Sequence, residues 1–162
     1  MSAAQGPARE ARVEHALDLA LRYLGPRDRT VAEVRARLER SEVREPALAE
    51  ALARLEALGA LDDDGFAARF AEDRRALDGW GAERIARRLR ERGIERELAE
   101  SVAAPAGGRD GELAAALAVL ERRFPSPPGD ARRERERAYG VLVRKGYDPE
   151  LAADAVREHL RD

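Results

Sequence analysis

The chain has 162 residues, enough for one ordinary domain or for a few small repeats that share a continuous core. Hydrophobic residues make up 44% of it, charged residues 38% and aromatic residues 4%, which favours a helix-rich protein with a core of leucine, valine and alanine. The lack of cysteine excludes disulfides and thiolate zinc sites, and the lack of an apolar run of about 18 residues or a signal-peptide core predicts a cytoplasmic protein without membrane contact.

Helical periodicity predicts nine helices, and no segment alternates with the period of two that is typical of a strand. Residues 1–10 are rich in Ala, Gly, Pro and Gln, and we expect them to be disordered. The helices are expected near 12–24, 30–40, 46–58, 64–77, 81–92, 95–103, 111–124, 130–145 and 149–160.

The predicted helices belong to three copies of one unit. RIARRLRERGIERELAESV at 84–102 matches RAYGVLVRKGYDPELAADA at 137–155 at an offset of 53, and a weaker copy lies upstream, where Val34 and Leu38 correspond to Ile85 and Leu89. We therefore predict an all-α fold of three tandem three-helix repeats that form an elongated, curved solenoid-like array. The expected repeats are 11–61, 62–104 and 109–162.

Local signals mark where these helices begin and end. Thr30 and Glu33 form a capping-box pattern at the start of a helix. Gly93 and Gly146 occupy equivalent positions where a helix should stop in a left-handed conformation. Leu48, Leu52, Leu55 and Leu58 form one apolar stripe at spacings of three and four.

The segment LDDDGFAARF at 61–70 carries three consecutive aspartates. A calcium loop with Gly65 at its sixth position would have alanine at positions one and twelve, so the ligand spacing fails. The best interpretation is that Asp63 or Asp64 caps a helix, with a contact to a partner as the alternative. Phe66 and Phe70 lie on one face of that helix and are expected in the core.

Trp80 lies between two glycines at a junction between predicted helices. It either fills the seam between the first and second repeats or anchors a partner interface, where tryptophan is common. No nucleophile–base pair or phosphate-binding loop can be assembled, and His15 and His159 have no ligand-spaced neighbours. We therefore expect no enzyme activity, no metal and no cofactor.

Basic side chains concentrate in two equivalent segments, although the formal net charge of the chain is −2. Residues 84–92 hold five arginines against one glutamate, and residues 132–145 hold six basic residues against two acidic ones. A regular array could place both segments on one side. The alternative is a solvated helix face with ion pairs such as Glu83 with Arg87. The candidate partner-binding residues are Arg84, Arg87, Arg88, Arg92, Arg133, Arg137, Arg144 and Lys145, with Trp80 as a possible interface aromatic.

The centre of the chain contains Asp63, Phe66-Ala67, Phe70, Arg74, Gly79-Trp80-Gly81, Arg84-Ile85, Leu89 and Gly93-Ile94, and the third repeat contains RKGYDPELAADAV. In these residues the chain resembles the RecX family, whose members regulate the bacterial RecA recombinase. The similarity runs from about residue 14 to residue 160. In the first repeat, Ser41-Glu42 stands where the family often has a glycine.

The resemblance implies a non-enzymatic protein that binds within the groove of the RecA–DNA filament. Such a protein inhibits ATP hydrolysis, strand exchange and co-protease activity in recombination and the SOS response. A monomer with weak, non-specific nucleic-acid contact would fit this role. Two other classes stay open from the residues, a direct DNA-binding module of tandem helix-turn-helix-like units and a scaffold with no connection to nucleic acid.

Overall fold

The computed structural model describes residues 5–125 and 131–160, and within them the chain is all-α, with nine helices and no strand. The three-helix organisation predicted from the sequence is confirmed. No helix in these residues is both long and apolar enough to cross a membrane. The helices are α1 (Gln5–Leu24), α2 (Val31–Arg40), α3 (Ala47–Ala57), α4 (Asp63–Asp78), α5 (Ala82–Glu91), α6 (Arg96–Ala103), α7 (Gly108–Arg123), α8 (Ala131–Lys145) and α9 (Pro149–His159).

The chain divides into two compact units. The first unit ends at Phe66 and also includes Arg92–Ile94, whereas the second contains Ala67–Glu91 and everything from Glu95 onward. The helix α4 therefore begins in the first unit and continues in the second.

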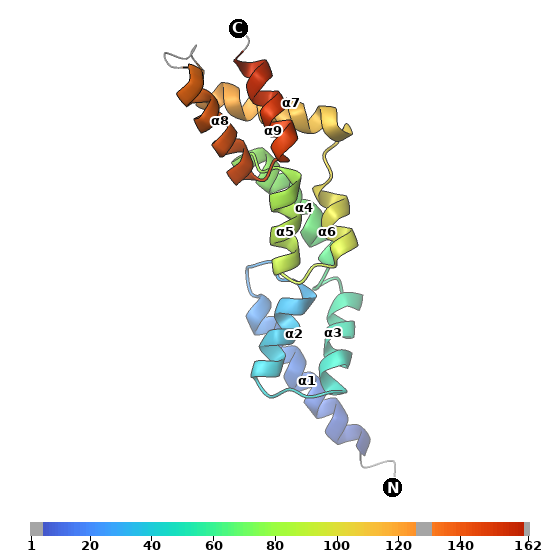
Figure 1. The fold of residues 1–162 in the computed structure, drawn as a ribbon. Helices are drawn as coiled ribbons and strands as arrows, with labels where there is room; N and C mark the ends of the chain where they lie inside the picture. The colour runs from blue at the N-terminus through green and yellow to red at the C-terminus, as the bar shows by residue number, and fades with distance from the viewer. Residues whose placement is uncertain (1–4, 126–130, 161–162) are drawn as a thin grey trace. The chain divides into compact units, whose positions relative to one another are not determined.

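In the first unit α1, α2 and α3 pack together as a three-helix bundle (Figure 1). The predicted capping box is present, because Thr30 Oγ1 accepts from the Glu33 amide and the Glu33 carboxylate accepts from the Thr30 amide. The α3 stripe is buried except for Leu58, which is 80% exposed because α3 ends one residue before it. The core consists of Val13, Ala16, Ala20, Val34, Leu38, Val43, Ala47, Leu48, Ala51, Leu52, Leu55 and Leu61.

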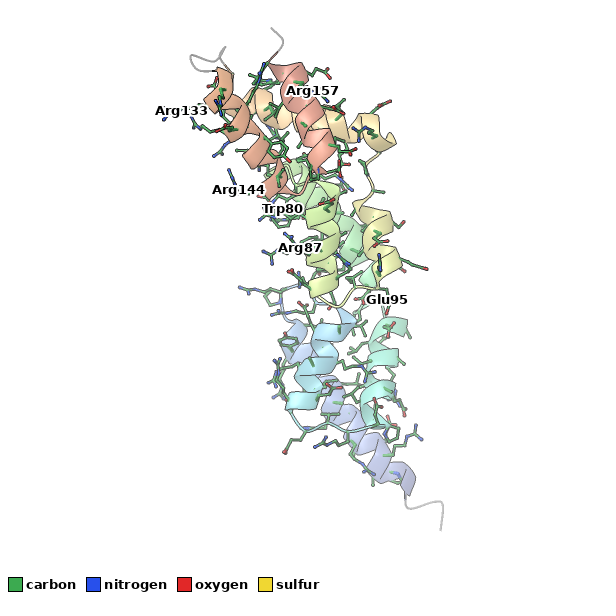
Figure 2. The ribbon with its side chains drawn as sticks, in the orientation of Figure 1. Trp80, Arg87, Glu95, Arg133, Arg144 and Arg157 are labelled. Atoms are coloured by element: carbon green, nitrogen blue, oxygen red, sulfur yellow. The ribbon has the colours of Figure 1, made fainter. Side chains whose placement is uncertain are left out.

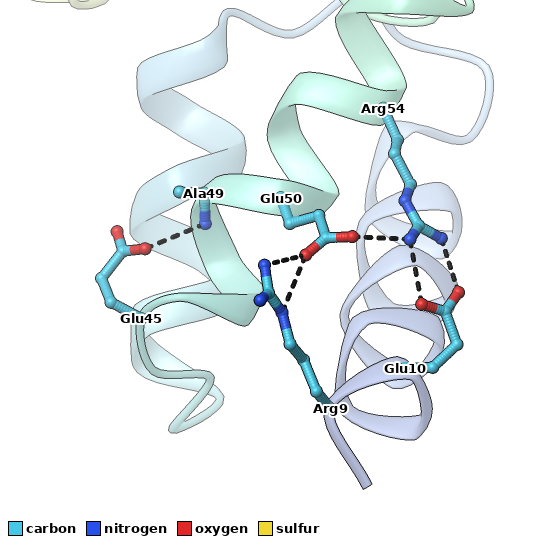
Figure 3. Close-up of polar contacts among 6 residues, drawn as sticks. All are labelled: Arg9, Glu10, Glu45, Ala49, Glu50 and Arg54. Atoms are coloured by element: carbon cyan, nitrogen blue, oxygen red, sulfur yellow. Dashed lines mark hydrogen bonds and ion pairs between the residues drawn. The ribbon is translucent and has the colours of Figure 1, made fainter. Parts of the chain in front are cut away.

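The first helix begins earlier than the sequence suggests. Residues 5–10, expected to be disordered, are helical, whereas residues 1–4 lie outside the described part of the chain. Side chains explain the extra turns, since Arg9 donates to Glu50 at 2.6 Å and Arg54 donates to both Glu10 and Glu50 (Figure 3). These hydrogen bonds, from Arg9 and then Arg54, lower the pKa of Glu50 below its ordinary value.

The three aspartates have separate structural roles. Because α4 begins at Asp63, its cap is Asp62, whose carboxylate accepts from the Gly65 amide at 3.0 Å, and not Asp63 or Asp64 as predicted. Asp63 instead accepts from the Val31 amide at 2.9 Å and so satisfies the first turn of α2. Burial, and the charges of its acidic neighbours, raise the pKa of Asp63, although the Val31 amide opposes this. Among the described residues, no three His, Asp or Glu side chains come together as metal ligands.

In the second unit α5 packs against α6, while α7, α8 and α9 form a second bundle (Figure 1). The interior of the α5–α6 pair is lined by Ile85, Ala86, Leu89, Ala99 and Ala103, all of them buried. The core of the α7–α9 bundle consists of Ala116, Val119, Leu120, Ala138, Val141, Leu142, Tyr147, Leu151, Ala152, Ala155 and Val156.

A left-handed turn follows the second helix of each repeat. The turns are Ser41–Val43, Arg92–Ile94 and Lys145–Tyr147, and their middle residues have φ of 62°, 82° and 90°. At the two glycines a second constraint applies. A β-carbon on Gly93 would lie 2.2 Å from Ala32 Cβ, and one on Gly146 would lie 2.2 Å from Arg84 Cβ. The glycines are therefore required both by backbone conformation and by close approach of a neighbouring helix.

We expect Gly93→Ala to lower the free energy of unfolding by about 2–4 kcal/mol, because left-handed strain and a steric overlap add together. Gly59→Ala is the matched control. Gly59 has φ of 70°, but a β-carbon added there would have no neighbouring atom within 4 Å, so strain alone should cost about 1 kcal/mol. Denaturant unfolding followed by circular dichroism measures both values, and equal losses would show that the close approach at Gly93 is unimportant.

Candidate functional site

The eight predicted basic residues divide into two groups. Those of the first group are exposed and point away from the helix bundles, whereas those of the second are half-buried and engaged in contacts within the protein. The exposed group is Arg87, Arg88, Arg133, Arg137 and Arg144, and the engaged group is Arg84, Arg92 and Lys145.

The three predicted arginines of α8 come together. Arg133, Arg137 and Arg144 lie on one face of the helix and line a depression of about 540 Å³. Its other lining residues are Arg123, Phe124, Glu136 and Val141, so four arginines face one glutamate. The Arg137 guanidinium lies 5.9 Å from the Phe124 ring centroid. This combination of positive charge and an aromatic surface suits an anionic partner.

Two members of this depression lie outside the predicted basic segment. Arg123 and Phe124 come from the end of α7, on a different element from the predicted basic segment. The signal was available in the pair Arg122-Arg123 in the last turn of that helix. Sequence periodicity could not predict that the end of α7 packs beside α8.

The α5 arginines are exposed and lightly paired. Arg88 Nη1 lies 2.7 Å from a Glu91 oxygen, and Arg87 pairs with the same carboxylate at 4.0 Å, whereas the alternative of a solvated face had suggested Glu83 as its partner. Arg90, which was not among the predicted residues, is also exposed and makes no ion pair with any described residue. Exposed helical pairs contribute only about 0.3–0.5 kcal/mol, so these arginines can exchange their partner at little cost.

Arg92 is part of the interior of the first unit. Its guanidinium binds Glu33 through two hydrogen bonds of 2.8 and 2.9 Å and stacks 4.4 Å from the Phe66 ring centroid. Its carbonyl accepts from Thr30 Oγ1 at 2.7 Å. Burial acts to raise the pKa of Glu33, but the Arg92 and Thr30 hydrogen bonds and the arginine charges together lower it.

Lys145 takes part in the equivalent contact of the second unit, in which the Lys145–Tyr147 turn packs against the start of α5. Its carbonyl accepts from the Gly81 amide at 2.8 Å, and the next carbonyl, of Gly146, accepts from the Glu83 amide at 3.2 Å. The Lys145 ammonium donates to the Asp78 carbonyl. Burial and then the charge of Arg123 lower the pKa of Lys145. This lysine is therefore a structural donor with limited access to a partner.

Tyr147 adds a buried hydrogen bond to this contact. Its side chain is 2% exposed and its hydroxyl donates to the Gly79 carbonyl at 3.2 Å. Burial, reinforced by the charge of Glu112, raises the pKa of Tyr147 to about 12. The hydroxyl therefore stays protonated, as a hydrogen-bond donor, across the physiological pH range.

Trp80 lies where α5 begins, next to the end of α8 (Figure 2). The Arg84 guanidinium stacks 4.1 Å from its ring centroid, and Phe70 meets it edge-on at 6.2 Å. Both neighbours belong to the second repeat, while the flanking glycines contact the third. The predicted seam between the first and second repeats is therefore wrong, since the glycines that fix Trp80 pack against the third. Phe66 is buried as predicted, but Phe70 is only half-buried.

Comparison with known proteins agrees with this division into repeats. Residues 16–55, 62–102 and 110–156 match, in order, the first, second and third three-helix domains described for RecX. The chain belongs to the RecX family. A protein named regulatory protein RecX from Mycobacterium sp. strain JLS is 31% identical over 153 residues, which cover 92% of this chain and 84% of the relative. A protein of the same name from Chlorobium phaeobacteroides strain BS1 is 30% identical, and the match covers 90% of this chain and 91% of the relative.

Solved RecX structures share the fold. The crystal structure of RecX from Lactobacillus salivarius has a TM-score of 0.77 and 19% identity and covers 93% of this chain and 97% of its own. A second crystal structure, of a regulatory protein RecX, has a TM-score of 0.70 and 22% identity, and the match covers 96% of this chain and 74% of that one. The name shared by the RecX relatives supports a regulatory role for this chain.

The Glu33–Arg92 pair of this RecX-family chain should be visible in its acid stability. Because the folded pKa of Glu33 lies below its ordinary value of 4.5, the pair stabilises the fold fully above that pH. Its contribution is lost as the pH falls through the folded pKa. We expect Glu33→Gln to be less stable at pH 7 and to lose less stability on acidification than the wild type. Urea unfolding between pH 7 and pH 3 measures this, with Glu14→Gln, at an exposed position of α1, as the control. Identical pH profiles for wild type and Glu33→Gln would contradict the assignment.

Proposed function

We propose that this chain is a non-enzymatic cytoplasmic regulator that binds the RecA filament on DNA as a monomer. In this role it inhibits recombinase ATP hydrolysis, strand exchange and co-protease activity, and so modulates DNA repair and the SOS response. Membership of the RecX family supports the regulatory part of the proposal.

The observation that carries the proposal is the arginine depression of the third repeat. Four arginines from α7 and α8 surround one glutamate there, and none of Arg123, Arg137 and Arg144 makes an ion pair with a described residue. The exposed arginines of α5 lie in the same compact unit. A filament that carries acidic protein surface and DNA phosphates offers many anionic groups to such a surface.

The test is DNA-dependent ATP hydrolysis by RecA filaments in the presence of substoichiometric amounts of the protein. We expect the wild type to inhibit. The triple variant Arg133→Glu, Arg137→Glu, Arg144→Glu should need at least about tenfold more protein for half inhibition, because a loss of about 1.4 kcal/mol of binding free energy already has that effect.

The matched control reverses the same number of charges in the first unit, at Arg12, Arg22 and Arg40, which are exposed and do not line the depression. That variant should inhibit like the wild type. Absence of inhibition by folded wild-type protein would overturn the proposed function. Equal losses in the two triple variants would show that only total charge matters.

A second candidate is direct binding of DNA, and Phe124 beside the arginines favours it because bases stack on aromatic rings. It predicts tight binding to naked DNA whose affinity falls steeply with salt. If about four phosphates are neutralised, the logarithm of the binding constant should fall against the logarithm of the salt concentration with a slope near −3.6. Weak, non-specific DNA binding would agree with the filament proposal, whereas tight sequence-specific binding would favour the alternative.

A further inference from the structure

The contact between the Lys145–Tyr147 turn and the start of α5 joins the two groups of exposed arginines in the second unit. Two backbone hydrogen bonds, from the amides of Gly81 and Glu83, and one from the Tyr147 hydroxyl hold the turn in place. The missing β-carbon of Gly146 lets the turn approach within contact of the Arg84 backbone. The end of α8 and the beginning of α5 are thereby fixed to each other.

Arg84 lies at the centre of this contact. Its guanidinium stacks on Trp80 and its Nη1 donates to the Arg144 carbonyl at 2.9 Å, at the negative end of the α8 dipole. Its Nε is buried and has no hydrogen-bond partner. A buried donor without a partner is costly, so the position of Arg84 is held by its other contacts. Arg84 is half-buried and its guanidinium is engaged on the Trp80 ring and the Arg144 carbonyl.

Arg84 nevertheless lies between the two groups of exposed arginines, one helical turn from Arg88 and hydrogen-bonded to the Arg144 carbonyl. Arg88 lies one turn further along α5, on the same face as Arg84. On the other side, the residue whose carbonyl Arg84 binds is Arg144, and Arg137 lies two turns back along α8. Figure 2 shows Arg144 and Trp80 close to the junction of the two helices. The order of the cations along the surface is therefore α8 arginines, Arg84, then Arg88.

We infer that Arg84 is a positioning residue that holds the arginines of α5 and α8 at one fixed spacing, so that both groups bind one rigid anionic partner at once. The inference rests on the proposed function, in which that partner is the filament. Two contact groups on one rigid body bind far more tightly than the same groups on a loose one, because the second contact costs little further entropy. Loosening the junction should weaken binding even though every exposed arginine is retained.

Two variants loosen the junction in different ways. Arg84→Ala removes both the stacking on Trp80 and the hydrogen bond to Arg144. Arg84→Lys keeps the charge but loses the planar stacking, so it should restore only part of the binding.

Because Trp80 is the only tryptophan, its fluorescence reports directly on the junction, and its emission should shift in Arg84→Ala. Circular dichroism shows whether each variant is folded. Arg96→Ala, at an exposed position of α6 whose side chain pairs with Glu100, is the control that should change nothing.

The decisive measurement is filament binding in a double-mutant cycle between Arg84→Ala and Arg137→Gln. We expect Arg84→Ala to bind about tenfold more weakly than the wild type, and Arg137→Gln to matter less in that background than in the wild type, because a loose junction no longer lets the two groups bind together. If the double variant loses binding by the product of the two single fold-losses, the two substitutions act independently and Arg84 acts only through stability. That result would overturn the inference while leaving the proposed function intact. Failure of the wild type to bind filaments at all would overturn both.

Discussion

The close approach of two backbones at a left-handed glycine is the constraint on which the structure depends. At Gly146 the absence of a β-carbon allows the end of α8 to lie against the start of α5, and at Gly93 the same absence admits the first turn of α2. Once the backbones are this close, amides at the start of one helix can donate directly to carbonyls at the end of another. The unsatisfied groups that every helix end carries are thus paired within the protein.

This way of joining helices explains why some of the predicted basic residues are not part of the exposed arginine groups on α5 and α8. A helix end presents carbonyls that need donors, and arginine and lysine reach them easily. Arg84 donates to the Arg144 carbonyl and Lys145 to the Asp78 carbonyl, while Arg92 is held by the Glu33 carboxylate. Arginine therefore has two uses in this chain, as a donor inside helix contacts and as an exposed cation on α5 and α8. Composition alone cannot separate them.

The sequence predicted local features well and contacts between repeats poorly. The helices, the capping box at Thr30 and the left-handed glycines all follow from signals within a few residues, and they were found as expected except that α1 begins earlier than predicted. Of the predicted surface, the α8 arginines were brought together because one helix carries them all. Arg123, Phe124 and the surroundings of Trp80 depend on how helices far apart in sequence pack, and periodicity within one helix contains no information about that.

The first repeat has the same turn as the other two but a different residue in it. Glu42 adopts φ of 62°, close to the conformation of Gly93 and Gly146, yet it has the β-carbon that those two lack. A helix brought to Glu42 at the separations found at the glycines would overlap with that atom. The turn after α2 therefore cannot receive a further helix in the same manner, and the series of docked turns stops there. The β-carbon of Glu42 thus rules out, at the turn of the first repeat, the close backbone approach found at Gly93 and Gly146, and the left-handed φ of Glu42 strains that turn.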